Sequence, residues 1–263
     1  MELLLESNVP QEEMIAGVVL TLPHRWVRIV PFKHRFYPNV DDYGRADFIP
    51  YGSTRMVAMA LERGFEGVHY DEQAFGYDRA LSVRPDMLNI SAGVMTIRNA
   101  LTVLLDDKEG KWFMRPVSGL KPFCGTVDTS ERLLMLLMGA LQGGSSQIEP
   151  LTHATRVLLN RPIRIEEEYR VHIVGGRVVA CDMYRVMGSG QAVRAMNVFT
   201  STMADAMQHL ADVWLPNECC VMDVARISNG ELRVTEFNCI NAAGFYTEDS
   251  ARATLFALYN HHR

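Results

Sequence analysis

VMDVARISNGELRVTEFN, residues 221–238, carries three oxygen-bearing side chains at regular spacing, Asp223, Glu236 and Asn238. Apolar and polar residues alternate on both sides of residues 228–230 (SNG), as in two strands joined by a turn. Strand residues two apart point to the same face, so Glu236 and Asn238 project together and the turn can bring Asp223 opposite them. Two carboxylates and an amide oxygen are ligands that suit Mg²⁺. The sequence therefore predicts a hairpin with a magnesium-binding face.

A simpler interpretation of the same residues is the polar face of a solvent-exposed hairpin, because carboxylates are common on strand surfaces. The apolar neighbours Val221, Val224, Val234 and Phe237 argue against it, since they predict a hairpin with one face packed on a core. We therefore expect the acidic residues to border a buried region.

Outward from this hairpin, apolar periodicity and turn residues predict the other elements. Helices are expected at 53–64, 94–105, 129–141, 203–214 and from about 249 to the end. Strands are expected at 27–30, 111–117, 156–165, 169–174, 177–184, 219–225 and 231–237. Gly175-Gly176 is typical of a two-residue hairpin turn. The polar stretch 106–110 (DDKEG) is the predicted boundary between a mixed α/β leading domain and the rest.

Composition limits the classes of function. The 263 residues include 26 Lys and Arg against 31 Asp and Glu, a formal net charge of −5, which argues against a protein that coats polyanions. A hydrophobic content of 48% excludes intrinsic disorder. The five cysteines are an odd number without CxxC spacing, and no segment reaches the roughly 18 apolar residues of a membrane span. These features predict reduced thiols and a cytoplasmic protein, and they leave its oligomeric state open.

A second group of side chains is cationic and precedes the acidic hairpin: Arg115, Lys121, Arg170 and Arg185. Arginine can bridge phosphate oxygens with its planar fork and lysine offers a point charge, so together with Mg²⁺ they could neutralise a triphosphate. Alternatively, Arg170 and Arg185 pair across their strands with nearby acids such as Glu168 or Asp182. The sequence leaves both interpretations open.

Residues 158–162 (LLNRP) precede the three glutamates 166–168. An extended apolar segment can offer backbone groups to an adenine edge, and a nearby carboxylate can accept ribose hydroxyls. A run of three glutamates is also typical of a solvated turn. The chain contains no GxxxxGK[ST], GxGxxG, HExxH or GxSxG motif, so it lacks the signatures of P-loop, dinucleotide, zinc-protease and serine-hydrolase sites.

Four segments, taken in order and spacing, resemble the ATP-grasp superfamily: WFMRPVSGLKPFCG (112–125), EEEYRVHIVGGRVVACDMYR (166–185), VMDVA (221–225) and TEFNCINAAGFY (235–246). Within it they resemble the divergent R-two-K clade of bacterial and phage proteins, which includes the eukaryotic cell-division-cycle chaperone that assembles initiation factor two. An Asp, a Glu thirteen residues later and an Asn two residues beyond form the arrangement of the superfamily's metal-binding strands. The resemblance covers about residues 106–248.

The resemblance implies an α+β protein with the ATP-grasp fold, in which two α+β subdomains enclose a nucleotide. A smaller α/β domain, residues 1–106, would precede them. The lid subdomain would span 107–165, and the C-terminal metal and nucleotide subdomain 166–263. One departure from the superfamily pattern is Arg115-Pro116, where the first lid lysine followed by proline is usual.

The resemblance also implies the cofactors ATP and Mg²⁺ and a role for each candidate residue. Asp223, Glu236 and Asn238 would hold the metal. Nucleotide contacts would come from Arg115 and Lys121 at the phosphates, Leu159 and Asn160 near adenine, Glu168 near ribose, and Arg185. Arg170, Arg185 and Lys121 would be catalytic, the two arginines contacting phosphate or an acyl phosphate. The substrates would lie where the leading domain meets Asn241, Gly244 and Tyr246.

In the superfamily the usual reaction activates a carboxylate as an acyl phosphate, which an amine then attacks. The resemblance therefore implies an ATP-dependent carboxylate–amine ligase whose substrate pair belongs to a peptide or protein. Two alternatives stay open: an assembly chaperone that binds Mg·ATP without ligation, and a ligase that acts on nucleic-acid ends. The net charge of −5 argues against the last of these.

Overall fold

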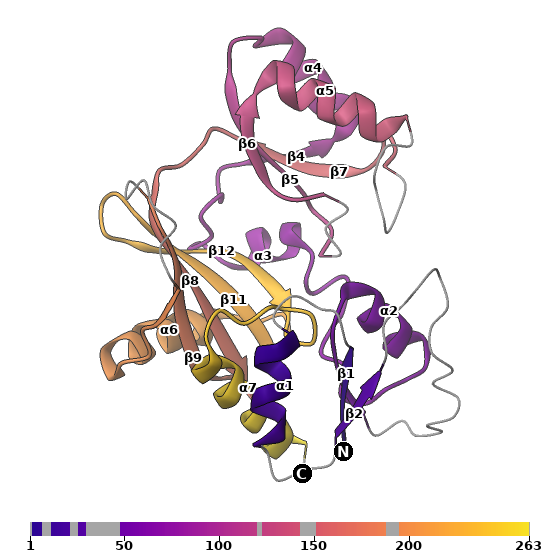
Figure 1. Ribbon diagram of the computed structural model, residues 1–263. Coiled ribbons are helices and arrows are strands. Elements are labelled where there is room, and N and C mark those ends of the chain that lie inside the picture. The colour runs from indigo at the N-terminus through magenta and orange to yellow at the C-terminus, as the bar shows by residue number, and fades with distance from the viewer. Residues whose placement is uncertain are drawn as a thin grey trace.

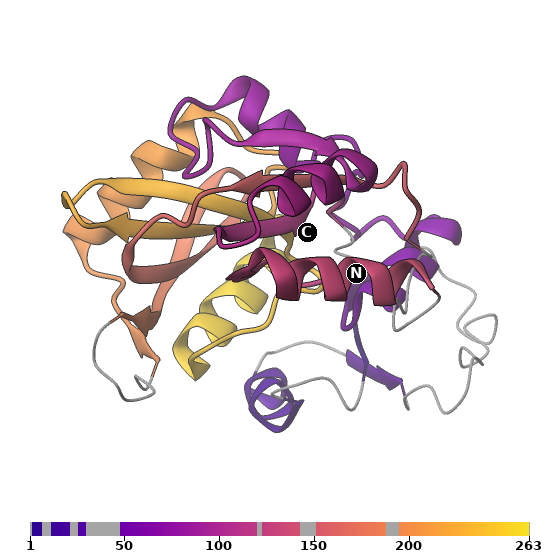
Figure 2. The ribbon, with the colours of Figure 1, turned by 90° about the horizontal axis from the view of Figure 1, so that it is seen from above.

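The computed structural model describes residues 2–6, 12–21, 26–29, 48–119, 123–142, 151–187 and 195–262. Within these residues the chain forms three separate sheets of three, four and five strands, each accompanied by helices (Figure 1). Seen from above, the three-stranded part lies to one side of the five-stranded sheet (Figure 2). We name these parts the leading domain, the lid and the platform.

The leading domain contains a parallel sheet in the order β2-β1-β3. Its elements are β1 (Glu2–Glu6), α1 (Glu12–Leu20), β2 (Trp26–Ile29), β3 (Phe48–Tyr51) and α2 (Thr54–Glu62). The sequence predicts β2 and α2, and the Ser53 hydroxyl does cap α2 by accepting from the Met56 amide at 3.3 Å. It misses β1, α1 and β3, because runs of four or five apolar residues do not distinguish strand from helix.

The lid is an antiparallel sheet in the order β4-β7-β5-β6, with α4 and α5 packed together beside it at the top of Figure 1. Its elements are β4 (Gly93–Thr96), α4 (Ile97–Asp106), β5 (Lys111–Pro116), β6 (Thr126–Thr129), α5 (Ser130–Leu141) and β7 (Arg156–Asn160). The predicted boundary at residue 106 falls at the end of α4, inside the run that builds this sheet. The division into three domains stays a prediction.

The platform is an antiparallel sheet in the order β10-β9-β8-β11-β12. Its strands are β8 (Ile165–Val174), β9 (Arg177–Val186), β10 (Met196–Asn197), β11 (Cys220–Ile227) and β12 (Leu232–Cys239). Both predicted hairpins are present, and their turns contain Gly175, Gly176 and Gly230 at positive φ of 57°, 73° and 86°. The predicted strand 156–165 is instead divided, since β7 ends at Asn160 and Pro162 follows it.

Two helices cover opposite faces of the platform, α6 (Ser201–Val213) and α7 (Glu248–His261). Met207 of α6 packs on the face that includes Val171, whereas Leu258 of α7 packs on the face that includes Val174. On this second face α7 covers the Val174 end of β8 and leaves the other end open to the lid. The short helix α3 (Tyr77–Val83) lies between lid and platform (Figure 1).

Asn241, in the loop after β12, joins the platform to the leading domain. Its amide nitrogen donates to the carbonyl oxygens of Pro50 at 2.7 Å and Gly67 at 2.9 Å, and its Oδ1 accepts from the His69 amide at 2.8 Å. Asn241 is fully buried, so every one of these bonds is shielded from water. The leading domain and this loop are therefore fastened to each other.

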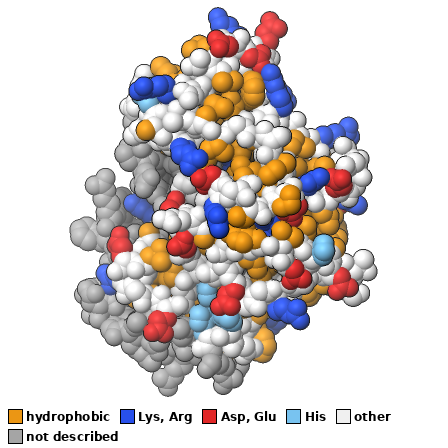
Figure 3. Space-filling model, turned by 180° about the vertical axis from the view of Figure 1, so that it is seen from behind, with side chains coloured by type: hydrophobic (Ala, Val, Ile, Leu, Met, Phe, Trp, Pro, Cys, Tyr) orange, Lys and Arg blue, Asp and Glu red, His pale blue; other side chains and the backbone are white. Residues whose placement is uncertain are grey.

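None of the described helices is long and apolar enough to cross a membrane. The five cysteines, all within the described residues, are free thiols, as predicted. On the face shown in Figure 3 basic and acidic side chains are interspersed.

Candidate functional site

The three side chains predicted to bind a metal do converge. Asp223 on β11 lies opposite Glu236 on β12, and Asn238 shares their face of the sheet. The Asn238 amide nitrogen donates to Asp223 Oδ2 at 3.0 Å and to Glu236 Oε1 at 3.3 Å. Asn238 thus contacts both carboxylates, and we name these three residues the acidic cluster.

Arg170 on β8 is the cation that belongs to this cluster. Its Nε lies 2.9 Å from Asp223 Oδ1 and its Nη2 lies 2.9 Å from Asp223 Oδ2, so the guanidinium forms a bidentate ion pair with the carboxylate. Its carbon lies 5.0 Å from the ring centre of Tyr246, and its Nη1 donates to the Gly244 carbonyl at 3.1 Å. Burial opposes the charge of Arg170, but the Asp223 carboxylate outweighs it and raises the pKa of the guanidinium. Arg170 is therefore cationic and fixed in place.

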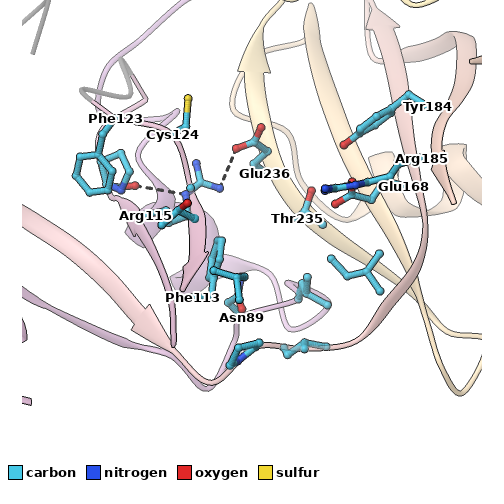
Figure 4. Close-up of a pocket in the computed structure, with 18 residues that line it drawn as sticks. Asn89, Phe113, Arg115, Phe123, Cys124, Glu168, Tyr184, Arg185, Thr235 and Glu236 are labelled. Carbon is cyan, nitrogen blue, oxygen red and sulfur yellow. Dashed lines mark hydrogen bonds and ion pairs between the residues drawn. The ribbon is translucent and has the colours of Figure 1, made fainter. Parts of the chain in front are cut away.

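Arg115 comes from the other side, on lid strand β5. Its Nη1 lies 2.8 Å from Glu236 Oε2, and its guanidinium carbon lies 4.2 Å from the ring centre of Tyr77. The contact with Glu236 crosses from the lid to the platform, as the dashed line in Figure 4 shows. Arg115 is only 7% exposed, so this pair is partly shielded from water.

Between lid and platform lies a cavity of about 570 Å³, which we name the main cavity. Figure 4 shows Phe113, Phe123 and Arg115 on its lid side, and Glu168, Tyr184, Arg185 and Glu236 on its platform side. A volume of this size is ordinary for a cofactor site. Of the charged and metal-binding residues predicted to share one pocket, Arg115, Glu168, Arg185 and Glu236 line this cavity, whereas the described residues Arg170, Asp223 and Asn238 do not.

Glu168 and Arg185 face the main cavity as a cross-strand pair. Arg185 Nη1 lies 3.1 Å from Glu168 Oε2, so the ion-pair interpretation of Arg185 is realised. Glu168 is largely buried, and this burial raises the pKa of its carboxyl group. Arg185 keeps its side chain 60% exposed, which leaves it able to reach a ligand.

Neither of the two residues predicted to lie near adenine, Leu159 and Asn160, lines the main cavity. The side chain of Leu159 is 3% exposed and packs in the lid core with α4 and α5, so it does not line the cavity. Strand alternation explains this, because successive residues of β7 face opposite sides. Asn160 reaches the cavity wall only indirectly, by donating to Asn89 Oδ1 at 3.2 Å. Lys121 lies outside the described residues, and its role stays a prediction.

Sequence reasoning missed the aromatic lining of the main cavity, above all Tyr184. The register of β8 and β9 shifts after Glu168, so Tyr184 is an extra residue between the pairs formed by Met183 and Arg185. This bulge lets both Tyr184 and Arg185 line the cavity. Simple alternation would place them on opposite faces, and the sequence itself gives no sign of the bulge.

The chemistry of the acidic cluster fits a hard cation. Two carboxylates and one amide supply oxygen donors of the type that Mg²⁺ prefers, once the Asn238 amide turns about its Cβ–Cγ bond to present its oxygen. Among the described residues no group of three or more His, Cys, Asp or Glu could hold a metal, so this mixed set is the best candidate. An ion bound here would compete with Arg170 for Asp223 and with Arg115 for Glu236, since each arginine contacts its carboxylate directly.

Comparison with solved structures identifies the fold. The chain aligns over its whole length with a D-cycloserine synthetase, DcsG, at a TM-score of 0.61 and 12% identity, covering 100% of both chains. The D-alanine–D-alanine ligase of Bacillus anthracis gives 0.60 at 11% identity, covering 99% of this chain and 96% of that one. The ATP-grasp ligase PsnB, complexed with a phosphomimetic variant of its minimal precursor, Mg and ADP, gives 0.57 at 12% identity, covering 100% and 98%. The fold is the ATP-grasp fold, as predicted.

The family follows from the sequence. Residues 108–258, more than half of the chain, match the ATP-grasp domain of R-two-K clade family 3. The protein belongs to this family, which confirms the predicted clade. The sequence matches no curated protein.

Proposed function

We propose that the protein binds Mg·ATP in the main cavity and uses it to join a carboxylate to an amine. One observation carries the proposal: Arg115, Arg185 and Glu236 come from three separate strands and line one cavity. Glu236 belongs to the acidic cluster, whose Asp223 is paired with Arg170. Opposite charges arranged in this way suit a metal-bound triphosphate. The solved ATP-grasp ligases of similar fold support the same proposed function.

The residues would divide the work as follows. Asp223, Glu236 and Asn238 would hold Mg²⁺, which when bound would neutralise phosphate charge. Arg115 and Arg185 would contact the phosphates, and Glu168 would accept hydrogen bonds from the ribose hydroxyls. The apolar side chains at the lid end, including Phe113 and Phe123, would exclude water from the base.

The reaction would proceed in two displacements. A carboxylate oxygen of the first substrate attacks the γ-phosphorus, the bond to the bridging oxygen breaks, and ADP leaves. An amine then attacks the acyl carbon, phosphate leaves, and the amine loses a proton. Arg170, fixed by Asp223, would stabilise the negative charge that develops on the acyl phosphate and on the tetrahedral intermediate. The precursor complex of PsnB supports a peptide or protein as one substrate.

The test uses ligand-linked stability. Mg·ATP at 100 times its Kd would stabilise the wild-type protein by about 2.7 kcal/mol, seen as a rise in Tm. Asp223→Asn and Glu236→Gln should abolish that rise, because each removes a carboxylate from the acidic cluster. Asp205→Asn and Glu62→Gln, at exposed helix positions, are the matched controls and should keep it.

An unchanged rise in Tm in both cluster variants would contradict the proposal. ADP formation then separates the two classes of function. Release of ADP that depends on added carboxylate and amine supports the ligase, whereas tight ATP binding with no turnover supports an assembly chaperone.

A further inference from the structure

A second, smaller cavity of about 170 Å³ adjoins the acidic cluster, and we name it the side cavity. Asn238 lines the side cavity, Glu236 lines the main cavity, and the two side chains are 3.3 Å apart. The acidic cluster therefore separates the two spaces. A group held in the side cavity can reach the cluster from the side opposite the nucleotide.

The side cavity is built at the junction of all three parts of the molecule. Helix α2 of the leading domain supplies Thr54 and Val57, and the loop after β12 supplies Cys239 and Ala242. Val57 is 2% exposed. The residues of α2 that pack in the leading-domain core are Met56, Met59 and Ala60, and Val57 is not among them. Its side chain is thus buried against the cavity rather than within that core.

The lid supplies the remaining wall through a close contact. Gly119 lies so near Tyr70 that a Cβ at that position would come within 2.8 Å of the Tyr70 hydroxyl. The Tyr70 hydroxyl donates to Glu72, which also accepts from the Ser118 hydroxyl at 2.8 Å. Glu72 therefore links Tyr70 of the wall to Ser118, the neighbour of the wall residue Gly119.

The chemistry of these walls is neutral. None of the described residues that line the side cavity carries a charged side chain. Cys239 contributes a thiol to the lining and Ala242 a methyl group. Burial and the neighbouring Glu72 carboxylate raise the pKa of Tyr70, which stays neutral. Among the described residues that line this space, a charged side chain would lose its hydration without meeting a charged partner.

The volume limits the occupant further. At about 30 Å³ of liquid volume per water molecule, 170 Å³ corresponds to five or six waters, hence to a group of about six heavy atoms. Alanine and serine have about this number of heavy atoms, and phenylalanine and lysine have more.

We propose that the side cavity holds the residue that bears the reacting carboxylate and selects a small, uncharged one. This inference rests on the proposed function, because the carboxylate must meet the γ-phosphate at the acidic cluster. The residue can be a free amino acid or the C-terminal residue of a peptide, since both present the same carboxylate. Val57, Ala242 and Cys239 are then the residues that determine specificity.

The experiment measures ADP release with Mg·ATP and hydroxylamine, which traps an acyl phosphate as a hydroxamate. The probes are glycine, both enantiomers of alanine and of serine, aspartate, lysine, phenylalanine, and the tripeptides Gly-Gly-Ala and Gly-Gly-Phe. We expect release with a small uncharged residue to exceed that with aspartate, lysine or phenylalanine at least tenfold. Comparison of free alanine with Gly-Gly-Ala shows whether the reacting carboxylate belongs to a free amino acid or to the C-terminal residue of a peptide.

Ala242→Leu should reduce this release at least tenfold by filling the cavity, while the rise in Tm with Mg·ATP persists. Ala58→Leu, on α2 but outside the cavity lining, is the matched control and should keep both properties. Val57→Ala enlarges the cavity and should shift the preference towards valine, which is added to the probes for this variant.

The outcomes separate the two proposals. Three results would each overturn the side-cavity assignment: unchanged selectivity in Ala242→Leu and Val57→Ala, a preference for a charged or aromatic probe, or no ADP release with any small residue. A rise in Tm with Mg·ATP would still support nucleotide binding in each case. Absence of that rise in the wild-type protein would overturn the proposed function itself.

Discussion

The platform and the lid face the same cavity but are built differently. The two platform hairpins pair strands of eight or ten residues, whereas the lid strands have four to six. The platform also carries both members of its main ion pair, Arg170 and Asp223, while the lid cation Arg115 has its carboxylate partner, Glu236, on the platform.

Exposed apolar side chains do not distinguish the two parts. Helix α5 of the lid leaves Met135 61% and Met138 49% exposed, and the platform helices α6 and α7 leave Val213 46% and Phe256 49% exposed. The two parts differ in where the partners of each ion pair lie. The difference indicates that the platform fixes the position of the charges and the lid completes the site by contact across the cavity.

The largest effect should come from breaking the ion pair within the platform. Arg170→Met leaves the Asp223 carboxylate, 3% exposed, without its bidentate partner. Removing one partner of a buried pair costs about 3–5 kcal/mol, because the other charge is left buried. Urea unfolding, monitored by circular dichroism, measures the loss in unfolding free energy.

The double variant Arg170→Met/Asp223→Leu is the matched control, since it removes both charges together. Its stability should return to within about 1 kcal/mol of the wild type. A double variant as unstable as Arg170→Met would show that the contacts of Arg170 to Gly244 and Tyr246, rather than the ion pair, stabilise the platform.

A smaller effect, of opposite sign, is expected at His172 on the covered face of the platform. The ring is fully buried and stacks on Phe245, and neither nitrogen has a hydrogen-bond partner among the residues that the structure describes. Replacing an unpaired polar group with an apolar one of similar size gains about 1–2 kcal/mol. His172→Leu should therefore raise the unfolding free energy at pH 7.5, measured in urea.

The same variant changes the pH dependence. Burial lowers the pKa of His172 from its usual 6.5 to about 3. Between these two pH values the unfolded chain binds a proton at His172 and the folded protein does not. Stability is then complete above pH 6.5 and falls as the pH drops below it, by about 2 kcal/mol at pH 5. His172→Leu should remove this share of the decline. His69, whose pKa burial lowers to about 4, should still contribute its own share. Parallel pH profiles for wild type and variant would contradict the assignment.

The smallest effect on stability is expected in the lid. Arg115→Met removes the contact with Glu236, but that side chain is 20% exposed and keeps access to water. The cost should be about 1 kcal/mol, well below that of Arg170→Met. Arg115→Lys keeps the charge and serves as the control. A loss as large as that of Arg170→Met would erase the distinction between lid and platform.

The sequence predicts the platform well because its strands alternate, its turns contain glycine, and its site residues are fixed by short-range spacing. Asp223, Glu236 and Asn238 meet for this reason. The same rules fail where tertiary context decides. Leu159 faces the core because of the way β7 enters its sheet, and Tyr184 lines the cavity because of a bulge. The parallel leading sheet was missed because its strands are short and pair across long stretches of chain.

The hydrogen bonds of Asn241 bear on how the site can open. Since one buried amide ties Pro50, Gly67 and His69 to the loop after β12, the leading domain cannot pivot away from the platform without exposing several unpaired backbone groups. The lid is then the part that moves when the site opens, while the leading domain and the platform stay together as one unit. The walls of the side cavity from α2 and from this loop keep their spacing at every stage of such a cycle.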